Sequence, residues 1–489
     1  MILAWILIVP GIATLVTLAS RRAAPWVTLA SSLAVLALSA NAALGVTGQT
    51  TLDEAYVGLS LDALAAVYLL LVAFVGVTAA LYSIGYLPAH YSEQEETAPR
   101  YRAYWPLYNL FMISMLAVPL VSNLAMIWIA IELTTIFSAF LVAYEDRSTA
   151  LEAAWKYVTL TSVGAMIALF GVLVLYYGIN NAGQPVTWAG LLAAAPNLPP
   201  AVLLVSFVLW LVGFGTKAGL VPMHTWLPDA HSQAPASICG LLSGVEVSAA
   251  LYMLLRIYPA LVRNPGNLHP GAWYLVAGLL SVAVAAFLLL QVHDFKRLFA
   301  YSTIEHMGVI LAACGLGAGT NELGTVYQFF AHAFTKSFCF YAAGLATIVF
   351  GTQEIAKVRG LISRAPVVGW ALLLGGIAIA GAPPFALFIS EFQILATGFD
   401  ADEYHATGIL TALLVLAFIA ILYQIGRIVF GEPVAAPHAK LPATSVAALV
   451  LAFIPMLVFG LYLPPPLATL IHNAAALLGG GSCRLVQNC

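Results

Sequence analysis

The sequence predicts an all-α polytopic membrane protein with about fourteen transmembrane helices. Of its 489 residues, 62% are hydrophobic and only 8% are charged, and the mean hydropathy is +0.97. A soluble fold cannot bury so much apolar surface, whereas membrane-spanning helices present it to lipid. The second observation is a series of apolar runs of roughly 17–25 residues, the length that a helix needs to cross a bilayer. Pro-rich or charged segments separate most of these runs.

The expected spans divide the chain into four segments. They begin near residues 3, 26, 61, 105, 124, 153, 200, 237, 272, 298, 323, 366, 405 and 443. Residues 1–104 hold spans one to three, and residues 105–265 hold spans four to eight as a first repeat. Residues 266–432 hold spans nine to thirteen as a second repeat, and residues 433–489 hold the fourteenth span and a tail.

Prolines interrupt two of the expected spans. The seventh surrounds "TKAGLVPMHTWLP", which contains Pro222, and the twelfth surrounds "AGAPPFALFISEFQIL", residues 380–395. Proline removes a helical hydrogen bond and breaks the helix that contains it. The two places lie five spans apart, so their helices cross the membrane in opposite directions. Paired broken helices in matching positions predict two inverted five-helix repeats with a site near the bilayer midplane.

Basic residues predict the orientation in the membrane. With the N-terminus outside, most of the 18 lysine and arginine residues fall in loops on the inner side. These are Arg21, Arg22, Arg100, Arg102, Arg147, Lys156, Lys296, Arg297, Lys357, Arg359, Arg364, Arg427 and Lys440. Opposite loops and the tail hold Arg256, Arg263 and Arg484. The positive-inside rule then predicts that both termini lie on the outer side of the membrane.

Titratable side chains inside the spans carry the functional signal. A charge at the bilayer centre costs about 2.5–3.5 kcal/mol on insertion scales, so each one needs a reason. They are Glu132, Lys217, Glu246, Glu305, His306, His332, Lys336 and Glu391. Opposite charges lower the cost of burial, and each protonation change shifts the pKa of a neighbour. As a series, these groups predict proton or ion translocation.

Some residues of this series, taken singly, also have a purely structural explanation. A buried Glu–Lys pair can be purely structural, and His332 alone is typical of a core histidine with its hydrogen bonds satisfied. Glu305 lies near the start of the tenth span, where it can pair with Lys296 or Arg297 at the interface.

Other polar residues do not indicate a cofactor or metal. His224 and His231 favour loop hydrogen bonds over a metal because no third ligand accompanies them. Asp229 is expected to cap a helix or turn beside Pro228. Cys483 and Cys489 could form a disulfide on the outer side, but their position favours a disordered tail in which they are unpaired. The absence of CxxC and nucleotide-binding motifs predicts no cofactor, and the absence of a basic face predicts no nucleic-acid partner.

Four stretches resemble the antiporter-like proton-channel family over about residues 60–430. They read "GFGTKAGLVPMHTWLPDAHSQAPASICGLLSG", "HDFKRLFAYSTIEHMGVI", "HAFTKSFCFYAAG" and "PPFALFISEFQIL". This family includes the large membrane subunits of respiratory complex I and of Mrp-type Na⁺/H⁺ antiporters. The resemblance is closest to component F of hydrogenase-4 and formate hydrogenlyase.

The resemblance implies roles for charged residues at the two ends of the series. Glu132 matches a fifth-span glutamate that pairs with the seventh-span lysine, which Lys217 matches. Glu391 matches the terminal carboxylate of the twelfth span, which releases protons on the exit side.

The central residues follow the family with one departure. His306 and His332 match histidines of its central hydrophilic axis, and Lys336 matches an eleventh-span lysine of some branches. Where the M subunit of complex I has an eighth-span lysine, this sequence has Ser248, with Glu246 two residues earlier. Two residues turn a helix by about 200°, so Glu246 faces another helix unless the helix is locally rewound.

The resemblance implies a proton-translocating membrane subunit of an energy-converting oxidoreductase of the group 4 hydrogenase or formate hydrogenlyase kind. Its expected partners are other membrane subunits and an Fe–S/NiFe peripheral arm, which holds the redox chemistry. The alternatives are an Mrp-like Na⁺/H⁺ antiporter subunit and a subunit of proton-driven inorganic-carbon transport. A scaffold with an inactive channel is a third reading, suggested by the eighth-span departure.

Overall fold

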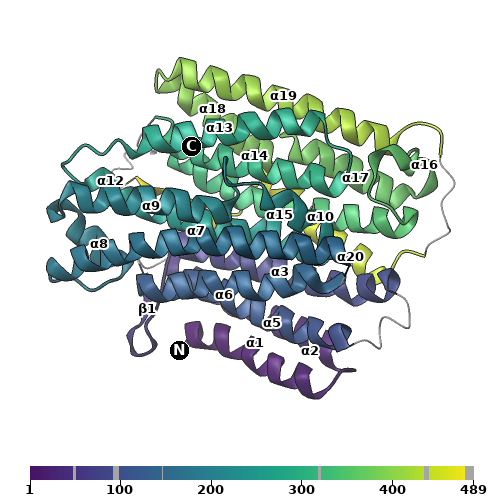
Figure 1. Ribbon diagram of the computed structural model, residues 1–489, viewed down its shortest axis with the longest axis horizontal. Coiled ribbons are helices and arrows are strands. Elements are labelled where there is room, and N and C mark those ends of the chain that lie inside the picture. Colours follow the sequence, from purple (N-terminus) through teal and green to yellow (C-terminus); the bar gives the residue numbers. More distant parts are fainter. Residues whose placement is uncertain (48–50, 92–98, 146, 318–320, 434–439, 480–489) are drawn as a thin grey trace.

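The protein is a bundle of long helices that lie side by side (Figure 1). The computed structural model describes residues 1–47, 51–91, 99–145, 147–317, 321–433 and 440–479. Within these ranges, 13 helices are long and apolar enough to cross a membrane. The expected twelfth span adds two shorter pieces, Pro366–Ile379 and Ala386–Asp400. The prediction of an all-α membrane fold with about fourteen spans is therefore confirmed.

The N-terminal part contains the only described strands. Its elements are α1 (Ile2–Ala19), α2 (Ala24–Thr47), β1 (Thr51–Glu54), η1 (Ala55–Val57), β2 (Leu59–Asp62) and α3 (Ala63–His90). The antiparallel hairpin β1–β2 was not predicted. The hairpin contacts the start of α1, where Glu54 accepts hydrogen bonds from the N–H groups of Leu3 and Ala4 at 3.0 and 3.2 Å. Asp62 likewise caps α3 by accepting from the N–H of Ala65 at 2.9 Å.

The middle of the chain holds a close helix crossing. Its elements are α5 (Pro99–Leu120), α6 (Leu124–Val142), η2 (Ala143–Glu145), α7 (Ser148–Asn181), α8 (Trp188–Ala194), η3 (Ala195–Asn197), α9 (Pro200–Ala218), α10 (Trp226–Gln233), α11 (Ala236–Leu241), η4 (Leu242–Glu246) and α12 (Val247–Arg263). A Cβ atom on Gly213 would lie 2.5 Å from the carbonyl oxygen of Gly164. The missing side chains therefore let the backbones of α7 and α9 approach closely.

The second half of the chain repeats this kind of contact. Its elements are α13 (Pro270–Leu290), α14 (Phe295–Gly315), α15 (Glu322–Phe350), η5 (Ile355–Lys357), α16 (Leu361–Arg364), α17 (Pro366–Ile379), α18 (Ala386–Asp400), α19 (Tyr404–Val429), α20 (Ala443–Leu461) and α21 (Pro465–Leu478). A Cβ atom on Gly278 of α13 would lie 2.6 Å from the carbonyl oxygen of Gly308 of α14. Glycine again permits the close crossing.

Both predicted helix breaks are present. After α9 the chain turns at Gly219, which has φ = 74°, and resumes as α10. After α17 it turns at Gly381, also with φ = 74°, and resumes as α18. Glycine adopts this left-handed conformation without a steric penalty, so it ends a helix cleanly. At the first break, the indole N–H of Trp226 donates to the carbonyl oxygen of Thr216 at 2.8 Å, which satisfies a helix-end acceptor.

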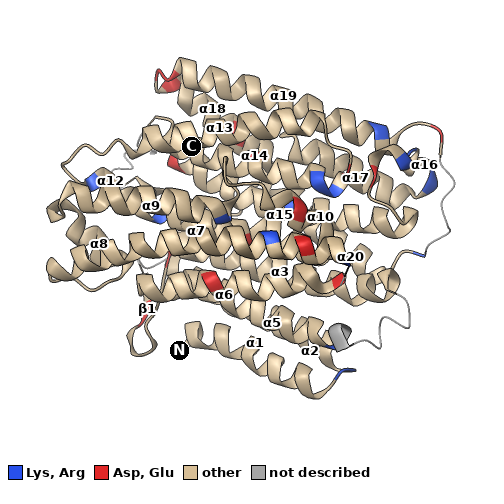
Figure 2. Cartoon of the chain, in the orientation of Figure 1, with Lys and Arg blue, Asp and Glu red and all other residues tan. Residues whose placement is uncertain are grey.

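Charged residues gather at one end of the bundle, the right-hand end in Figure 2. This end, called the basic end below, carries the α1–α2 turn, the start of α14 and the segment that follows α15. Several of the basic residues assigned to loops lie within helices instead. Lys296 is in the first turn of α14 and is 1% exposed. Arg256 lies within α12, where its guanidinium pairs with Asp62.

Candidate functional site

Most of the predicted titratable residues lie in or beside two buried clusters, both of which contact η4. The first, called the lysine–glutamate cluster, contains Lys217, Glu246, Tyr157, Thr135 and Ser138. The second, called the histidine cluster, contains His306, His332, Gln328, Ser390 and Glu391. The helical segment that contains η4 is buried from Ala236 to Leu261, apart from the partly buried Arg256. Polar groups at this depth need partners within the protein because lipid offers none.

In the lysine–glutamate cluster an ion pair joins α9 to η4. The Lys217 ammonium lies 3.0 Å from Oε1 of Glu246, and the two side chains are 2% and 3% exposed. The ammonium also donates to the hydroxyl of Thr135 at 2.6 Å. Oε1 of Glu246 further accepts from the hydroxyls of Tyr157 and Ser138, at 2.6 and 3.0 Å. A buried ion pair is tolerated when its remaining donors and acceptors are satisfied in this way.

A π-helical turn directs Glu246 toward Lys217. The turn is η4, which covers Leu242–Glu246 between the α-helical segments α11 and α12. A π turn inserts an extra residue into a helix and rotates the side chains on either side of it relative to each other; such turns are frequent at functional sites. This is the local rewinding that would let Glu246 depart from the direction expected in a regular helix. Ser248, two residues further on, is buried and donates to the carbonyl of Gly244 at 3.2 Å.

The predicted pair between Glu132 and Lys217 is not formed. Glu132 lies half-buried on α6, where it accepts a hydrogen bond from Ser162 of α7 at 2.8 Å. Its second carboxylate oxygen is buried and has no hydrogen-bond partner among the described residues. Lys217 is instead engaged by Glu246, because η4 brings that carboxylate to the lysine.

The histidine cluster joins α14, α15 and α18. The imidazole rings of His306 and His332 lie 5.4 Å apart between centroids. The side-chain amide of Gln328 donates to Nδ1 of His306 at 3.1 Å and to Oε1 of Glu391 at 3.3 Å. Nδ1 of His306 itself lies 3.6 Å from the same carboxylate oxygen. Since Nδ1 accepts, Nε2 carries the proton and donates to the carbonyl of Ile379 at 3.0 Å.

The π turn also contacts the histidine cluster. Nε2 of His332 lies 3.2 Å from the carbonyl oxygen of Ser243, which is part of η4. A carbonyl only accepts, so this nitrogen donates, and Nδ1 of His332 is left without a partner among the described residues. The hydroxyl of Ser243 contacts that of Thr303 at 2.6 Å. One five-residue turn thus touches both clusters.

Lys336 lies beside the histidine cluster without a carboxylate in direct contact. Its ammonium donates to the carbonyl of Phe299 at 2.8 Å and to the hydroxyl of Ser302, and its side chain is fully buried. Glu305, one turn further along α14, is 3% exposed and lies in the middle of the protein. Glu305 and Lys336 are within electrostatic range of each other.

The interfacial pairing considered for Glu305 is wrong. Lys296 donates to the carbonyl of Ala234 at 2.7 Å, and Arg297 pairs with Asp229. One carboxylate oxygen of Glu305 has no hydrogen-bond partner among the described residues. Glu305 is therefore a further buried acid beside the histidine cluster. The two clusters together with Lys336 and Glu305 are called the buried axis, or the axis, below.

Other sequence predictions have plainer outcomes. Nδ1 of His231 donates a hydrogen bond to the carbonyl oxygen of Leu227 at 2.8 Å, as expected for a hydrogen-bonded histidine. Asp229 lies in the first turn of α10, but its side chain does not cap the helix as expected and instead bridges Arg297 and Lys156. The described residues contain no group of three or more metal-ligating side chains. Cys483 and Cys489 lie outside the described residues.

Sequence reasoning missed Tyr157, Gln328 and Ser243. Tyrosine and glutamine inside apolar helices are common packing residues, so composition alone gives no signal for them. Sequence spacing could have identified one of them, Gln328. It precedes His332 by four residues and therefore lies on the same helix face.

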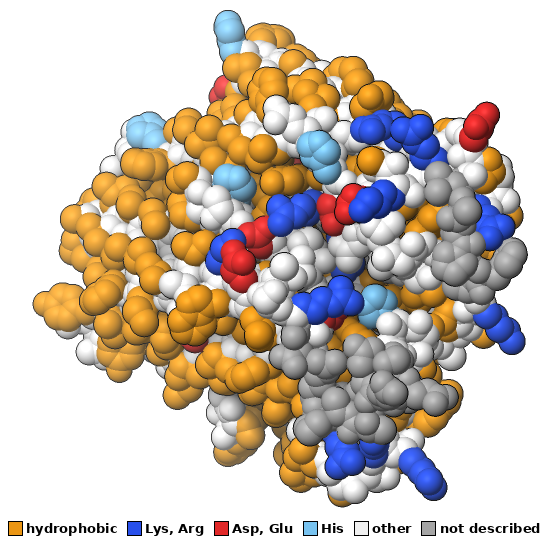
Figure 3. Space-filling view, turned by 45° about the vertical axis from the view of Figure 1, so that its right-hand side comes forward, with side chains coloured by type: hydrophobic (Ala, Val, Ile, Leu, Met, Phe, Trp, Pro, Cys, Tyr) orange, Lys and Arg blue, Asp and Glu red, His pale blue; other side chains and the backbone are white. Residues whose placement is uncertain are grey.

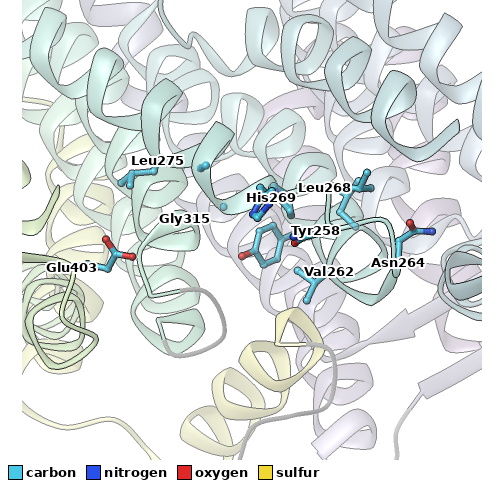
Figure 4. Close-up of a pocket in the computed structure, with 13 residues that line it drawn as sticks. Tyr258, Val262, Asn264, Leu268, His269, Leu275, Gly315 and Glu403 are labelled. Carbon is cyan, nitrogen blue, oxygen red and sulfur yellow. The ribbon is translucent and has the colours of Figure 1, made fainter. Parts of the chain in front are cut away.

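A cavity of about 480 Å³ lies at the end of the bundle opposite the basic end (Figure 4). It is separate from the lysine–glutamate and histidine clusters. Its lining includes Tyr258, Asn264, His269 and Glu403, from the α12–α13 connection and the start of α19. None of the predicted site residues lines it. The candidate site is therefore the buried axis and not this surface hollow.

Comparison with known proteins identifies the family. Residues 121–424 match the family model described as NADH:quinone oxidoreductase/Mrp antiporter, TM. Residues 51–101 match the model described as NADH-Ubiquinone oxidoreductase (complex I), chain 5 N-terminus. The hydrogenase-4 component F homolog of Methylacidiphilum infernorum is 35% identical over 85% of this chain and 88% of its own length. Hydrogenase-4 component B of Escherichia coli is 29% identical over 72% of this chain and only 52% of its own length.

Solved structures share the fold. A chain of the archaeal membrane-bound sulfane sulfur reductase superposes with a TM-score of 0.86 at 24% identity, covering 98% of this chain and 96% of that one. A chain of the Mrp complex from Dietzia sp. gives 0.86 at 20% identity, covering 98% and 97%. A chain of respiratory complex I from Thermus thermophilus gives 0.82 at 22% identity, covering 98% and 99%. Together with the family-model match, these findings show that the chain belongs to the family of membrane subunits shared by NADH:quinone oxidoreductases and Mrp antiporters.

Proposed function

We propose that the chain is a proton-translocating subunit of a multisubunit energy-converting complex. The observation that carries the proposal is the contact of η4 with both buried clusters. Glu246 of this turn pairs with Lys217, and Ser243 of the same turn accepts a hydrogen bond from His332. The relatedness to hydrogenase-4 component F supports the assignment to an energy-converting complex.

The geometry suggests how charge moves along the axis. Protonation of Glu246 would remove its attraction for Lys217, and the ammonium would then release a proton more readily. The histidine cluster comes next along the axis. Its side chains form a series of proton donors and acceptors in contact, and Glu391 is the last of them. In this scheme Lys336 and Glu305 store charge beside the histidines, since each protonation change alters the electrostatic energy of the other.

The partners follow from what the chain contains. Relatives of known structure are membrane subunits of larger complexes, so other membrane subunits are its immediate partners. We assign the redox chemistry to a peripheral Fe–S/NiFe arm, because the sequence has no cofactor motif of its own. The positive-inside rule places the basic end on the inner side of a bacterial or archaeal cell membrane.

A second candidate function is cation/proton antiport. It is favoured by similarity to Na⁺/H⁺ antiporter subunit A1 of Staphylococcus haemolyticus, 26% identical over 86% of this chain and 50% of that protein. Proton flux that requires added Na⁺ would support cation/proton antiport. Proton flux at full rate in a buffer without Na⁺ would support proton translocation without cation exchange.

Lys336 provides the test of the proposed function. Membrane vesicles containing the chain in its native complex are given a potassium diffusion potential with valinomycin, and a pH-sensitive dye reports proton movement. Lys336→Met is expected to slow this flux by about tenfold or more, because a positioned proton carrier contributes about 10²–10⁴ to a transfer rate. Lys440→Met, which removes an exposed lysine, should leave the flux unchanged. Unaltered flux in an assembled Lys336→Met complex would contradict the proposal.

A further inference from the structure

A polar cavity of about 500 Å³ opens at the basic end of the bundle. It lies between the ends of α3 and α15, the start of α14 and the α10–α11 connection. Its lining residues are Ala89, His90, Glu145, Arg147, Thr149, Ser232, Gln233, Asp294, Thr347, Ile348, Gly351, Thr352, Gln353 and Glu354. Figure 3 turns this end toward the viewer and shows acidic and basic side chains gathered across a largely apolar surface.

Glu145 is the most buried carboxylate of this cavity. Its side chain is 7% exposed, and Oε1 lies 3.3 Å from Nε2 of His90. The second oxygen lies 3.4 Å from the guanidinium of Arg147, which is itself 65% exposed. A carboxylate and an imidazole in contact at an opening that solvent can reach can exchange a proton with water. The buried hydroxyl of Tyr91 nearby has no hydrogen-bond partner among the described residues, which suits an adjoining water.

Asp294 adds a second acid at the start of α14. It accepts hydrogen bonds from the N–H groups of Lys296 and Arg297, at 2.7 and 3.0 Å. Burial raises the pKa of Asp294 despite these donors and the neighbouring positive charges. Its carboxylate therefore binds a proton more readily than an exposed aspartate.

Lys296 lies beneath the cavity. Its ammonium donates to the carbonyls of Ala234 at 2.7 Å and Ser232 at 3.4 Å, and Ser232 lines the cavity. The side chain is buried, and Glu145 lies within its electrostatic range. A buried lysine held by neutral carbonyls needs a nearby counter-charge, which Glu145 and Asp294 provide.

His231 connects this lysine to the axis. The ring is fully buried on α10, and its Nε2 has no hydrogen-bond partner among the described residues. The ring lies within electrostatic range of both Lys296 and Lys336. An unpartnered imidazole nitrogen within electrostatic range of two buried amines is a suitable acceptor for a transferred proton.

We propose that this cavity is the proton port of the buried axis at the basic end, an inference that rests on the proposed function. Glu145, with His90, takes a proton from water. The proton passes by way of Lys296 and His231 to Lys336, and each group releases one proton as it accepts the next. The route uses α3, η2, α10 and α14 and joins the axis at Lys336. Onward passage to Glu391 still requires the charge change at the Lys217–Glu246 pair.

The port is tested with Glu145→Gln in the native complex, using the flux assay with the potassium diffusion potential. Flux should fall by roughly tenfold, because a positioned proton donor is lost. Small weak acids such as formate or azide carry protons through water, so millimolar amounts should restore flux in this variant. They should not restore flux in Lys336→Met, whose lesion lies within the axis. Glu354→Gln is the matched control, since Glu354 lines the same cavity but is 56% exposed.

Each result decides a different question. Normal flux in Glu145→Gln alongside lost flux in Lys336→Met would overturn the port and leave the proposed function standing. Lost flux that no weak acid restores in an assembled complex would assign Glu145 a structural role and also overturn the port. Normal flux in Lys336→Met would contradict the proposed function itself. If Glu145→Gln does not assemble, His231→Asn carries the test, with slowed flux expected and normal flux contradicting the route.

Discussion

Replacing Lys217 with methionine is expected to slow proton flux by about a hundredfold, because the ammonium is a positioned proton donor of the axis. The same change leaves Glu246 as a buried carboxylate without its counter-charge. Removing one partner of a buried ion pair costs about 3–5 kcal/mol, so the thermal unfolding midpoint of the complex should also fall. Flux in vesicles and thermal unfolding in detergent measure the two effects separately.

A comparison of variants separates this pair from the one that family resemblance suggested. Glu246→Gln should reduce flux as strongly as Lys217→Met does, since it removes the carboxylate in contact with the ammonium. Glu132→Gln should reduce flux less, because Glu132 contacts Ser162 and not Lys217. The double variant Lys217→Met with Glu246→Leu should regain stability but not flux, because the unpaired charge is gone. A larger loss in Glu132→Gln than in Glu246→Gln would refute the assignment.

Gly381→Ala is expected to abolish flux through the terminal carboxylate. A Cβ atom at Gly381 would lie 2.0 Å from Oε2 of Glu391, so the carboxylate must leave its position beside Gln328 and His306. The residue also has φ = 74°, which costs a non-glycine residue about 1–2 kcal/mol. The displacement of Glu391, and not the backbone cost, should account for the loss of flux.

Gly183→Ala is the matched control for that variant. Gly183 has φ = 70°, and a Cβ atom there would meet no atom within 4 Å. The substitution therefore imposes a similar backbone cost at an exposed turn that contacts neither buried cluster. Vesicle flux should be near normal in Gly183→Ala and lost in Gly381→Ala. Equal losses in both variants would show that backbone strain, and not Glu391, is responsible.

The sequence was sufficient to predict the fold and the depth of the titratable residues. Pro222 and the pair Pro383–Pro384 predicted the broken helices, because proline lacks the N–H group that a helical hydrogen bond needs. Proline alone is not sufficient, since Pro10 and Pro259 lie inside α1 and α12. Isolated charges in apolar spans predicted buried clusters, because lipid excludes them. The β1–β2 hairpin was missed, since a short strand pair between two membrane helices leaves almost no pattern in the sequence.

The partners within the clusters could not be predicted in the same way. Which carboxylate meets Lys217 depends on the extra residue in η4, and no residue type in "LSGVE" marks a π turn. The resemblance supplied Glu132 instead, two helices away in the chain. Gln328 and Tyr157 were overlooked because each is ordinary as a packing residue. Only the helix crossings place them against Glu391 and Glu246.

Infrared difference spectroscopy of the carboxyl band of Glu391 gives the most direct test of whether the two clusters form one continuous path. The band is assigned by its disappearance in Glu391→Gln, and it is recorded while a proton gradient is imposed across vesicles. In the unaltered protein the band should change as the gradient is applied. In Lys217→Met, which leaves the surroundings of Glu391 intact, that response should vanish. A Glu391 response of full size in Lys217→Met would show that the clusters act independently and would contradict the single path.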